Sequence, residues 1–526
     1  MKISRFAVNG DAVSGRGGFD LADLRFRTFA VLFVALFLAA CVPLLLTPLP
    51  PLVDYPNHLA RMHVITGLAR SLPLQRYYAV VWRPLPDLAM DALVPPLLAV
   101  VSLQTAGKLF LAATYFASTG GVAALHRVTC RYWSAWPLTA FLLVYNRLLL
   151  WGFANFLFGL GLAFWALAGW IAWRQRGIGV RLVFGLVAAF AIYFAHLMAF
   201  GIYAAMILGY EAGRVWHCAA EPREAIRDLL VALLPMLPCL VLFGVTFVPL
   251  HAMASFASGL RFTRPVRKVD LLFSVFDLYS RPFDVVCFAL AVIGTATAYW
   301  RRWLRIAPEI VVPLIVLTLI YVFMPTTLFG ATGADRRMPL AMALLLVGGS
   351  AWQAPFARAG RTFLVAVLLM FAVRLGVVAV SWQMSGRTYA QLLAGLDALP
   401  PGARLAVAFS DAEVNVEATP LLHFPVLAVA RRDAFVPTLF AYVTQQPIAF
   451  TGEYGAVAAQ LSADALWRFY VAGTGALPPS LAQALAHCDY ITFAGRQPFT
   501  IRAGAGLTPF FVSPRFQIYR LPGTPS

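Results

Sequence analysis

The sequence predicts a polytopic α-helical membrane protein with a C-terminal α/β domain outside the membrane. Of the 526 residues, 61% are hydrophobic and only 12% are charged, whereas about a quarter of the residues in soluble domains are charged. The mean hydropathy is +0.76. Apolar runs of roughly 20 residues recur along the chain, and this is the length that a helix needs to cross a bilayer.

The apolar runs predict eleven membrane-spanning helices after a polar N-terminal tail at residues 1–27. The expected spans are 28–47, 107–126, 134–150, 153–173, 181–196, 197–210, 228–250, 283–300, 308–324, 338–354 and 361–383. The stretch 181–210 fits either one tilted helix or two short ones. Residues 28–383 thus form the expected membrane domain, with a first external loop at 48–92 and another at 251–282.

The distribution of arginine predicts the orientation. The net charge of +18 comes almost entirely from Arg, because Lys occurs only at positions 2, 108 and 268. With a cytoplasmic N-terminus, every expected inside loop carries at least two Arg, as the positive-inside rule requires. Topology therefore explains much of the charge, and nucleic acid is not an expected partner. High Arg with little Lys is typical of GC-rich bacterial genomes, so we expect a bacterial inner membrane.

The composition changes after residue 383, and residues 384–526 predict one α/β domain on the periplasmic or extracellular side. Strand-like runs occur at 404–409, 490–495 and 516–521, and helical stretches at 455–470 and 479–487. We identify no catalytic group in this domain. Its loosely spaced acidic residues and histidine are interpreted as solvated surface: Asp411, Glu413, Glu417 and His423.

The first external loop contains the polar stretch "VDYPNHLAR" (residues 53–61). If a helix begins near Asp54, then Asp54, His58 and Arg61 share one face at positions i, i+4 and i+7. Pro56 suits the first turn of such a helix. The alternative is that Asp54 is only an N-terminal cap.

A second external loop, "GADRRMP" (residues 333–339), places two adjacent arginines at the outer surface. Arg336 and Arg337 can hold phosphate oxygens by charge-assisted, bidentate bonds. The alternatives are a topological role or contact with anionic lipid. The basic run 261–268 has a simpler interpretation, attraction to acidic headgroups. Asn155 and His196 lie near the same surface, where they can line a cavity.

The layout resembles the GT-C superfamily of integral-membrane glycosyltransferases, of the protein mannosyltransferase or aminoarabinose transferase type. The resemblance rests on the whole-chain architecture and on "VDYPNHLAR". It implies that Asp54 is the catalytic base and that Arg336 and Arg337 bind the donor phosphate. Arg61 is a further phosphate-binding candidate, which with His58 also supports the site. Many members have adjacent acidic residues, whereas here Tyr55 follows Asp54. The expected supporting residues are Tyr55, Asn57, His58, Asn155, His196 and Asp335.

The expected function is inverting transfer of a sugar from a polyprenyl-phosphate donor to a glycan, lipid or protein acceptor at the outer face. A carboxylate takes the acceptor proton, and cations stabilise the departing phosphate. Some GT-C members need a divalent cation, but Asp54 and His58 are too few ligands to assign one. The alternatives are a transporter or flippase, and an oligosaccharide polymerase or ligase that uses a diphosphate-linked donor. The sequence does not identify the sugar or the acceptor.

Overall fold

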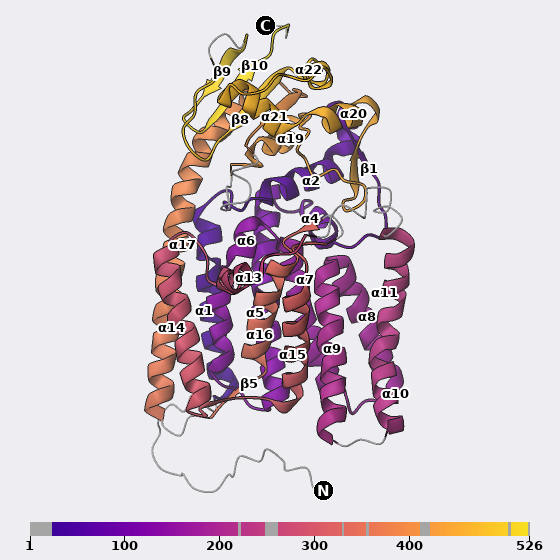
Figure 1. Cartoon of the computed structure of the whole chain (residues 1–526), viewed down its shortest axis with the longest axis vertical. Helices are drawn as coiled ribbons and strands as arrows, with labels where there is room; N and C mark the ends of the chain where they lie inside the picture. The colour runs from indigo at the N-terminus through magenta and orange to yellow at the C-terminus, as the bar shows by residue number, and fades with distance from the viewer. Residues whose placement is uncertain are drawn as a thin grey trace.

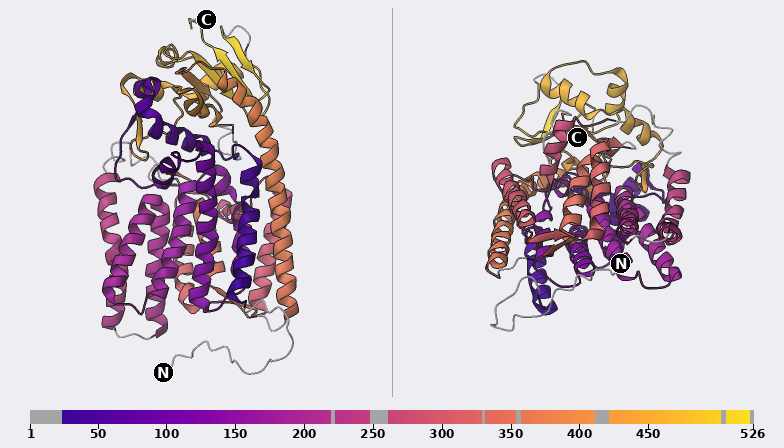
Figure 2. Two further views of the ribbon diagram at one scale, coloured as in Figure 1. Left: turned by 180° about the vertical axis from the view of Figure 1, so that it is seen from behind. Right: turned by 60° about the horizontal axis from the view of Figure 1, so that its bottom comes forward.

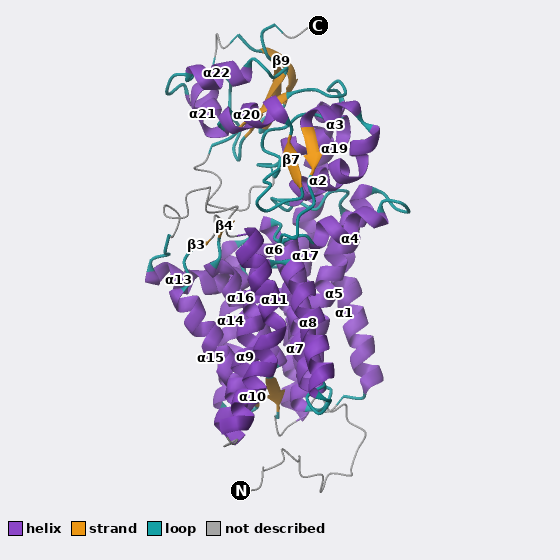
Figure 3. Cartoon of the chain, turned by 90° about the vertical axis from the view of Figure 1, so that its right-hand side faces the viewer, coloured by secondary structure: helices purple, strands orange, loops and turns teal. Residues whose placement is uncertain are grey.

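The computed structural model describes residues 24–218, 222–247, 261–328, 331–353, 357–410, 421–502 and 506–523. The described helices run side by side as a bundle, and the C-terminal residues form a separate layer above one end of it (Figure 1). The same two layers appear from behind and from the side (Figures 2 and 3). The predicted fold class, a helical membrane protein with a C-terminal sheet-containing region, is confirmed.

Most bundle helices match predicted spans. They are α1 (Phe26–Leu46), α5 (Leu103–Cys130), α7 (Ala154–Ala172), α8 (Ile178–Ala195), α9 (Leu197–Cys218), α10 (Pro222–Leu233), α11 (Leu237–Leu242), α14 (Arg281–Trp300), α15 (Pro308–Phe323), α16 (Met338–Gly348) and α17 (Ala357–Asp397). Within the described ranges, seven helical stretches are long and apolar enough to cross a membrane, and α15 is a shorter apolar helix. The helices α5 and α7 cross closely, because a Cβ on Gly161 would lie 2.6 Å from the Ala117 backbone.

The predicted span 134–150 is not one helix. It forms the 3₁₀ helix η2 (Trp136–Leu143) and the short α6 (Arg147–Trp151). The break has a local cause, because the Asn146 side chain accepts hydrogen bonds from the backbone of Leu148 and Leu149 and so caps α6. All residues of η2 are buried, so its apolar sequence reflects packing inside the protein and not contact with lipid.

The stretch 181–210 forms two helices. The chain breaks between α8 and α9 at His196, whose backbone is extended with φ −168° and ψ 129°. By contrast, α17 is one continuous helix that passes residue 384 and ends at Asp397. The change of composition at 384 therefore marks a change of surroundings along a single helix.

Arg374, which the sequence places in the middle of a span, is buried within the protein. Its guanidinium donates to Asp284 Oδ1 at 3.2 Å and to the Phe276 carbonyl at 3.1 Å. Tyr145 contributes a further carbonyl at 3.2 Å. An arginine in the hydrocarbon region needs such partners, because leaving it unpaired is costly.

The upper layer contains a mixed four-stranded sheet in the order β6 (Leu405–Ala408), β8 (Tyr490–Ala494), β10 (Phe516–Arg520) and β9 (Thr508–Val512). The pair β6–β8 is parallel and the other two pairs are antiparallel. The runs at 404–409, 490–495 and 516–521 are thus strands as predicted. The helices of this layer are α19 (Leu427–Arg432), α20 (Gly452–Gln460), α21 (Ala463–Trp467) and α22 (Pro479–Leu485), with η8 (Phe424–Val426) and η9 (Arg468–Ala472).

The first external loop also lies above the bundle and packs against this upper layer. It contains α2 (Tyr55–Gly67), η1 (Leu68–Arg70), α3 (Leu72–Tyr77), β1 (Tyr78–Val80) and α4 (Ala89–Leu97). Strand β1 pairs antiparallel with β7 (Ile448–Phe450). The Tyr78 hydroxyl donates to the Ala434 carbonyl at 2.9 Å and accepts from Val436 N at 3.0 Å. The loop and the C-terminal residues are therefore one folded unit above the bundle.

Short elements connect the bundle helices at both ends. At the upper end lie α13 (Pro265–Leu272), η6 (Phe273–Val275), η7 (Asp335–Arg337) and the hairpin of β3 (Thr327–Leu328) with β4 (Ala331–Thr332). Lys268 caps α15 from α13, because its ammonium donates to the carbonyls of Tyr321, Val322 and Met324 at 2.7 to 2.8 Å. At the lower end, β2 (Leu304–Ile306) pairs with β5 (Ser350–Trp352).

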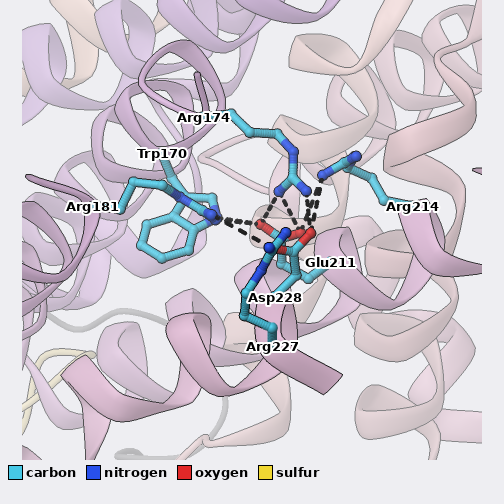
Figure 4. A network of polar contacts seen from close by, with 7 residues as sticks. All are labelled: Trp170, Arg174, Arg181, Glu211, Arg214, Arg227 and Asp228. Carbon is cyan, nitrogen blue, oxygen red and sulfur yellow. Dashed lines mark hydrogen bonds and ion pairs between the residues drawn. The ribbon is translucent and has the colours of Figure 1, made fainter. Parts of the chain in front are cut away.

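A polar network ties the lower ends of α7 to α10 together (Figure 4). Glu211 of α9 is fully buried and accepts from Trp170 at 2.8 Å, Arg174 at 2.6 Å and Arg181 at 2.9 Å. Asp228 of α10 also pairs with Arg174. A buried carboxylate is tolerated here because several cations surround it.

Candidate active site

A cavity of about 540 Å³ lies between the upper ends of the bundle helices and the upper layer. Its walls differ in chemistry. Apolar side chains of α9, α11 and α15 and of their connecting segments line one part, among them Phe200, Leu240, Phe243, Leu317, Ile320 and Met324. Charged and polar side chains line the other: Asp54, His58, Asp87, Asn155, His196 and Arg337 from the first loop and the bundle, and Tyr442, Gln445 and Gln446 from the upper layer.

Asp54 is the residue before α2, yet its side chain makes no capping hydrogen bond to that helix. It lines the cavity instead, so the interpretation of Asp54 as a plain helix cap does not hold. Its backbone N–H donates to the Trp151 carbonyl at 3.1 Å. The neighbouring Gly152 has φ +89°, and a Cβ there would lie 2.8 Å from Asp54 N. Only glycine allows this close approach.

The surroundings of Asp54 suit a proton acceptor. Burial raises the pKa of its carboxyl to about 7, although the charges of Arg337 and Arg61 act to lower it. Such a carboxyl ionises near neutral pH, which is the range that general base catalysis needs. His423 Nε2 lies 3.5 Å from Asp54 Oδ1, and burial lowers the pKa of His423 to about 4. The imidazole is therefore neutral and leaves the carboxylate available.

Arg61 is not placed to bind a donor phosphate. It is fully buried and forms a bidentate ion pair with Asp91, with N–O distances of 2.7 and 2.8 Å. Its Nη2 also lies 3.1 Å from His58 Nδ1. The phosphate role expected for Arg61 is thus corrected, since its guanidinium supports His58 behind the cavity wall.

His58 has a fixed tautomer. Because arginine can only donate, Nδ1 of His58 accepts from Arg61, and Nε2 carries the proton and donates to the Gly152 carbonyl at 3.2 Å. Burial, followed by the charge of Arg61, lowers its pKa to about 3. His58 therefore ties α2 to the turn that holds Asp54, and both ring nitrogens are engaged.

The two adjacent arginines have different surroundings. Arg337 lines the cavity, with its guanidinium 4.4 Å from the Phe153 ring centre. Among the described residues, Arg337 donates a hydrogen bond from Nη1 to the Thr332 carbonyl at 3.3 Å, and its Nε has no hydrogen-bond partner. Burial lowers its pKa to about 10, so it is still a cation at neutral pH. Arg336 instead stacks on Trp151 at 4.7 Å.

Asp335 is a structural residue. Its carboxylate accepts from Thr263 at 2.7 Å and from Thr326 at 3.1 Å, and it is completely buried. It therefore holds the segment before α13 against the loop that carries Arg337. This position lets its negative charge act on Arg337 without an ion pair between them.

Asn155 and His196 both line the cavity beside Asp87. Asn155 donates to the Asp87 carbonyl at 2.6 Å and accepts from Met90 N at 2.9 Å. His196 Nδ1 accepts from Met198 N at 3.0 Å, so this nitrogen carries no proton for Asp87 Oδ1, which lies 3.5 Å away. Asp87 Oδ1 accepts instead from Leu197 N at 3.2 Å. Asp87 has an unusual φ of +71°, and burial raises its pKa to about 6. The cavity thus contains a second carboxylate.

Tyr55 and Asn57 are buried supports of α2. The Tyr55 hydroxyl packs against Gly107 of α5, where a Cβ would lie 2.2 Å away. Asn57 Oδ1 accepts from Phe440 N at 2.8 Å and so joins α2 to the upper layer. Neither residue lines the cavity.

Sequence reasoning missed two parts of the site and left a third without a role. Asp87 stands out in the sequence as an acidic residue in the same external loop as Asp54, but no role was assigned to it. His423 was interpreted as solvated surface, but its side chain is only 12% exposed and its ring lies 5.0 Å from that of Phe440. The wall at 440–446 carried no signal, because its residue types are ordinary and its partners lie far away in sequence. Asp411, Glu413 and Glu417 lie outside the described residues.

No group of three or more His, Cys, Asp or Glu side chains that could hold a metal ion occurs among the described residues. Asp54 and His58 both line the cavity, but both nitrogens of His58 have protein partners. The pair therefore does not form a metal site in this arrangement.

No family model matches the sequence, and no curated protein matches it. Among solved structures, the chain is similar to the crystal structure of ArnT from Cupriavidus metallidurans in the apo state, with a TM-score of 0.51 over 94% of this chain and 98% of that chain. The sequence identity is 12%, so the similarity shows the fold, and the fold is the part of the expected resemblance that it confirms.

Proposed function

From an ArnT-like fold that encloses this cavity, we propose that the protein is a membrane glycosyltransferase that uses a polyprenyl-phosphate-linked sugar. One observation carries the proposal: a single cavity joins an apolar part, lined by bundle helices, to a polar part that contains Asp54 and Arg337. A donor of this class has the same division. Its prenyl chain is apolar, and its phosphate and sugar are polar.

The proposed reaction is one displacement with inversion. The acceptor hydroxyl attacks the anomeric carbon opposite the phosphate, and the new C–O bond forms as the bond from that carbon to the phosphate oxygen breaks. Asp54 takes the hydroxyl proton. Arg337 stabilises the charge that develops on the departing polyprenyl phosphate. A guanidinium without an ion-pair partner in the described part of the chain is suited to this role, because no bond to a carboxylate has to break first.

The other residues position these two groups. His58 and Gly152 fix the backbone at Asp54, and the Asp335 carboxylate fixes the loop of Arg337. Asp87 lies in the same cavity, where it adds negative charge that can stabilise the positive charge on the sugar ring in the transition state. We place the reaction at the outer face of a bacterial inner membrane, with a periplasmic upper layer, since the Arg-rich loops predict a cytoplasmic lower end.

Mass spectrometry of envelope glycans and lipids from a deletion strain tests the proposal. A transferase predicts the loss of one sugar-sized mass from an acceptor and the accumulation of its polyprenyl-phosphate sugar. A transporter or flippase predicts that the same molecules persist on the wrong side of the membrane. Accumulation of a diphosphate-linked oligosaccharide would instead identify a polymerase or ligase.

A further inference from the structure

The upper layer contributes its own wall to the cavity. This wall consists of Phe440, Tyr442, Gln445 and Gln446 and is called the 440–446 wall below. It belongs to the segment between α19 and β7, whereas the proposed reacting groups come from the first loop and the bundle. The wall therefore faces the reaction without belonging to the groups that carry it out.

The 440–446 wall is held at both ends. Phe440 N donates to Asn57 of α2 at 2.8 Å, and beyond the wall the Pro447 carbonyl accepts from Val81 N at 2.7 Å. Between these points, Gln445 N and Gln446 N both donate to the Tyr442 carbonyl, at 2.8 and 2.7 Å. The segment is therefore fixed before a ligand arrives, which favours selective binding.

The chemistry of the wall matches a sugar ring. Two carboxamides both donate and accept hydrogen bonds, as a ring of hydroxyl groups requires. The side-chain oxygen of Gln446 is buried and has no hydrogen-bond partner among the described residues. A buried acceptor without a partner is unfavourable, and a sugar hydroxyl that donates to it can remove that cost. Phe440 and Tyr442 add aromatic surface for the C–H faces of the ring, with their ring centres 6.2 Å apart.

The position of the 440–446 wall in the cavity indicates that the wall contacts the sugar and not the prenyl chain or the phosphate of the donor. The apolar part of the cavity suits the prenyl chain and Arg337 suits the phosphate, so the sugar attached to that phosphate lies in the remaining polar part. None of the four wall residues carries a charge. The charged side chains Asp54, Asp87 and Arg337 come from the first loop and the bundle.

We infer that the 440–446 wall binds the transferred sugar, that this sugar is a neutral, hydroxyl-bearing ring, and that Gln445 and Gln446 determine which sugar is accepted. The inference rests on the proposed function and assigns sugar specificity to the C-terminal part of the chain.

Binding of synthetic polyprenyl phosphates to the purified full-length protein in nanodiscs tests this inference. The probes are bare polyprenyl phosphate, the same lipid carrying mannose, glucose or galactose, and the lipid carrying 4-amino-4-deoxyarabinose. Affinities are measured by competition with a fluorescent polyprenyl phosphate. The wild type should bind at least one neutral-sugar lipid about tenfold more tightly than the bare lipid, the effect of one or two net hydrogen bonds.

The variants isolate the wall. In Gln445→Ala/Gln446→Ala the advantage of the sugar-linked lipid over the bare lipid should disappear, while the affinity for the bare lipid stays unchanged. Gln446→Leu, which keeps the volume of the side chain, should lose most of the same advantage. Gln460→Ala, on the exposed end of α20, is the matched control and should behave as wild type. Unchanged thermal unfolding of each variant confirms that it is folded.

The possible failures are distinguishable. A sugar advantage that survives in both wall variants overturns the inference and leaves the proposed function standing, as does a wild type that prefers the amino-sugar lipid. A wild type that binds the bare lipid as tightly as every sugar-linked lipid also overturns the inference and leaves the proposed function standing. A wild type that binds none of the lipids contradicts the proposed function itself.

Discussion

At the scale of single residues, the proposed chemistry depends on two side chains in unusual surroundings. Asp54 is a cavity carboxyl with a pKa near neutrality, and Arg337 is a cavity cation whose described hydrogen-bond partner is a backbone carbonyl. Both stand out in the sequence because each is a charged residue in an external loop. Arg61 stands out for the same reason, yet its charge is neutralised by Asp91. A sequence shows the charges of a loop but not which of them are already paired.

The rate of sugar transfer should rise with pH through about 7. Below that value Asp54 is protonated and cannot accept the acceptor proton, whereas above it the carboxylate is available. The expected kcat/KM falls about tenfold per pH unit on the acidic side. A pH profile of the purified enzyme checks this, and a profile that stays flat between pH 5 and 8 would contradict the role of Asp54 as base.

Arg337→Ala should weaken binding of polyprenyl phosphate and lower kcat, together by about 10²–10³ in kcat/KM, the range seen when one charge-stabilising donor is removed. Arg336→Ala is the control and should change kcat/KM by less than about tenfold, because Arg336 stacks on Trp151 outside the cavity. Steady-state kinetics measures both effects. Equal losses in the two variants would refute the assignment of the phosphate to Arg337.

At the scale of elements, the turn at Gly152 and the helix α2 together fix Asp54. The helix was predictable, because Pro56 and the spacing of Asp54, His58 and Arg61 indicate its start and one of its faces. A turn at 151–152 was also predictable, since the expected spans 134–150 and 153–173 leave these residues between them. The division of the first of these spans into η2 and α6 was not. Hydropathy alone does not distinguish a stretch buried in protein, such as η2, from one that faces lipid.

Gly152→Ala should lower kcat by about tenfold or more, because the added Cβ would lie 2.8 Å from Asp54 N and strain a backbone with φ +89°. Misplacement of a catalytic group by a fraction of an ångström is costly. Gly294→Ala is the control, since a Cβ on Gly294 meets nothing within 4 Å, and its kinetics should match wild type. Wild-type kcat in Gly152→Ala would show that the turn does not position Asp54.

Glu211→Ala should destabilise the lower ends of α7 to α10 by about 3–5 kcal/mol, the usual cost of breaking a buried ion pair. The variant leaves Arg174 and Arg181 without their main partner. Arg227→Ala removes an arginine that is 55% exposed, and it should cost no more than about 1 kcal/mol. Unfolding in detergent measures both, and similar losses would contradict the central place of Glu211.

At the scale of the whole molecule, the active site is an assembly of distant segments. Sequence reasoning predicted the bundle and the three strands at 404–409, 490–495 and 516–521, because each depends on local periodicity. It left 181–210 open between one helix and two, and the structure shows two. Sequence reasoning did not predict three other features: the pairing of β1 with β7, the contact of His423 with Asp54 and the 440–446 wall. These join residues more than 350 positions apart, and one sequence carries no record of such contacts.

The role of Asp54 in sugar transfer can be tested in cells by envelope-glycan and glycolipid mass spectrometry on a deletion strain complemented with either wild-type or Asp54→Asn protein, expressed at equal levels. We expect that the deletion removes one sugar-sized mass, that the wild type restores it, and that Asp54→Asn does not. Full restoration by Asp54→Asn would show that the cavity carboxylate is not the base of a sugar transfer.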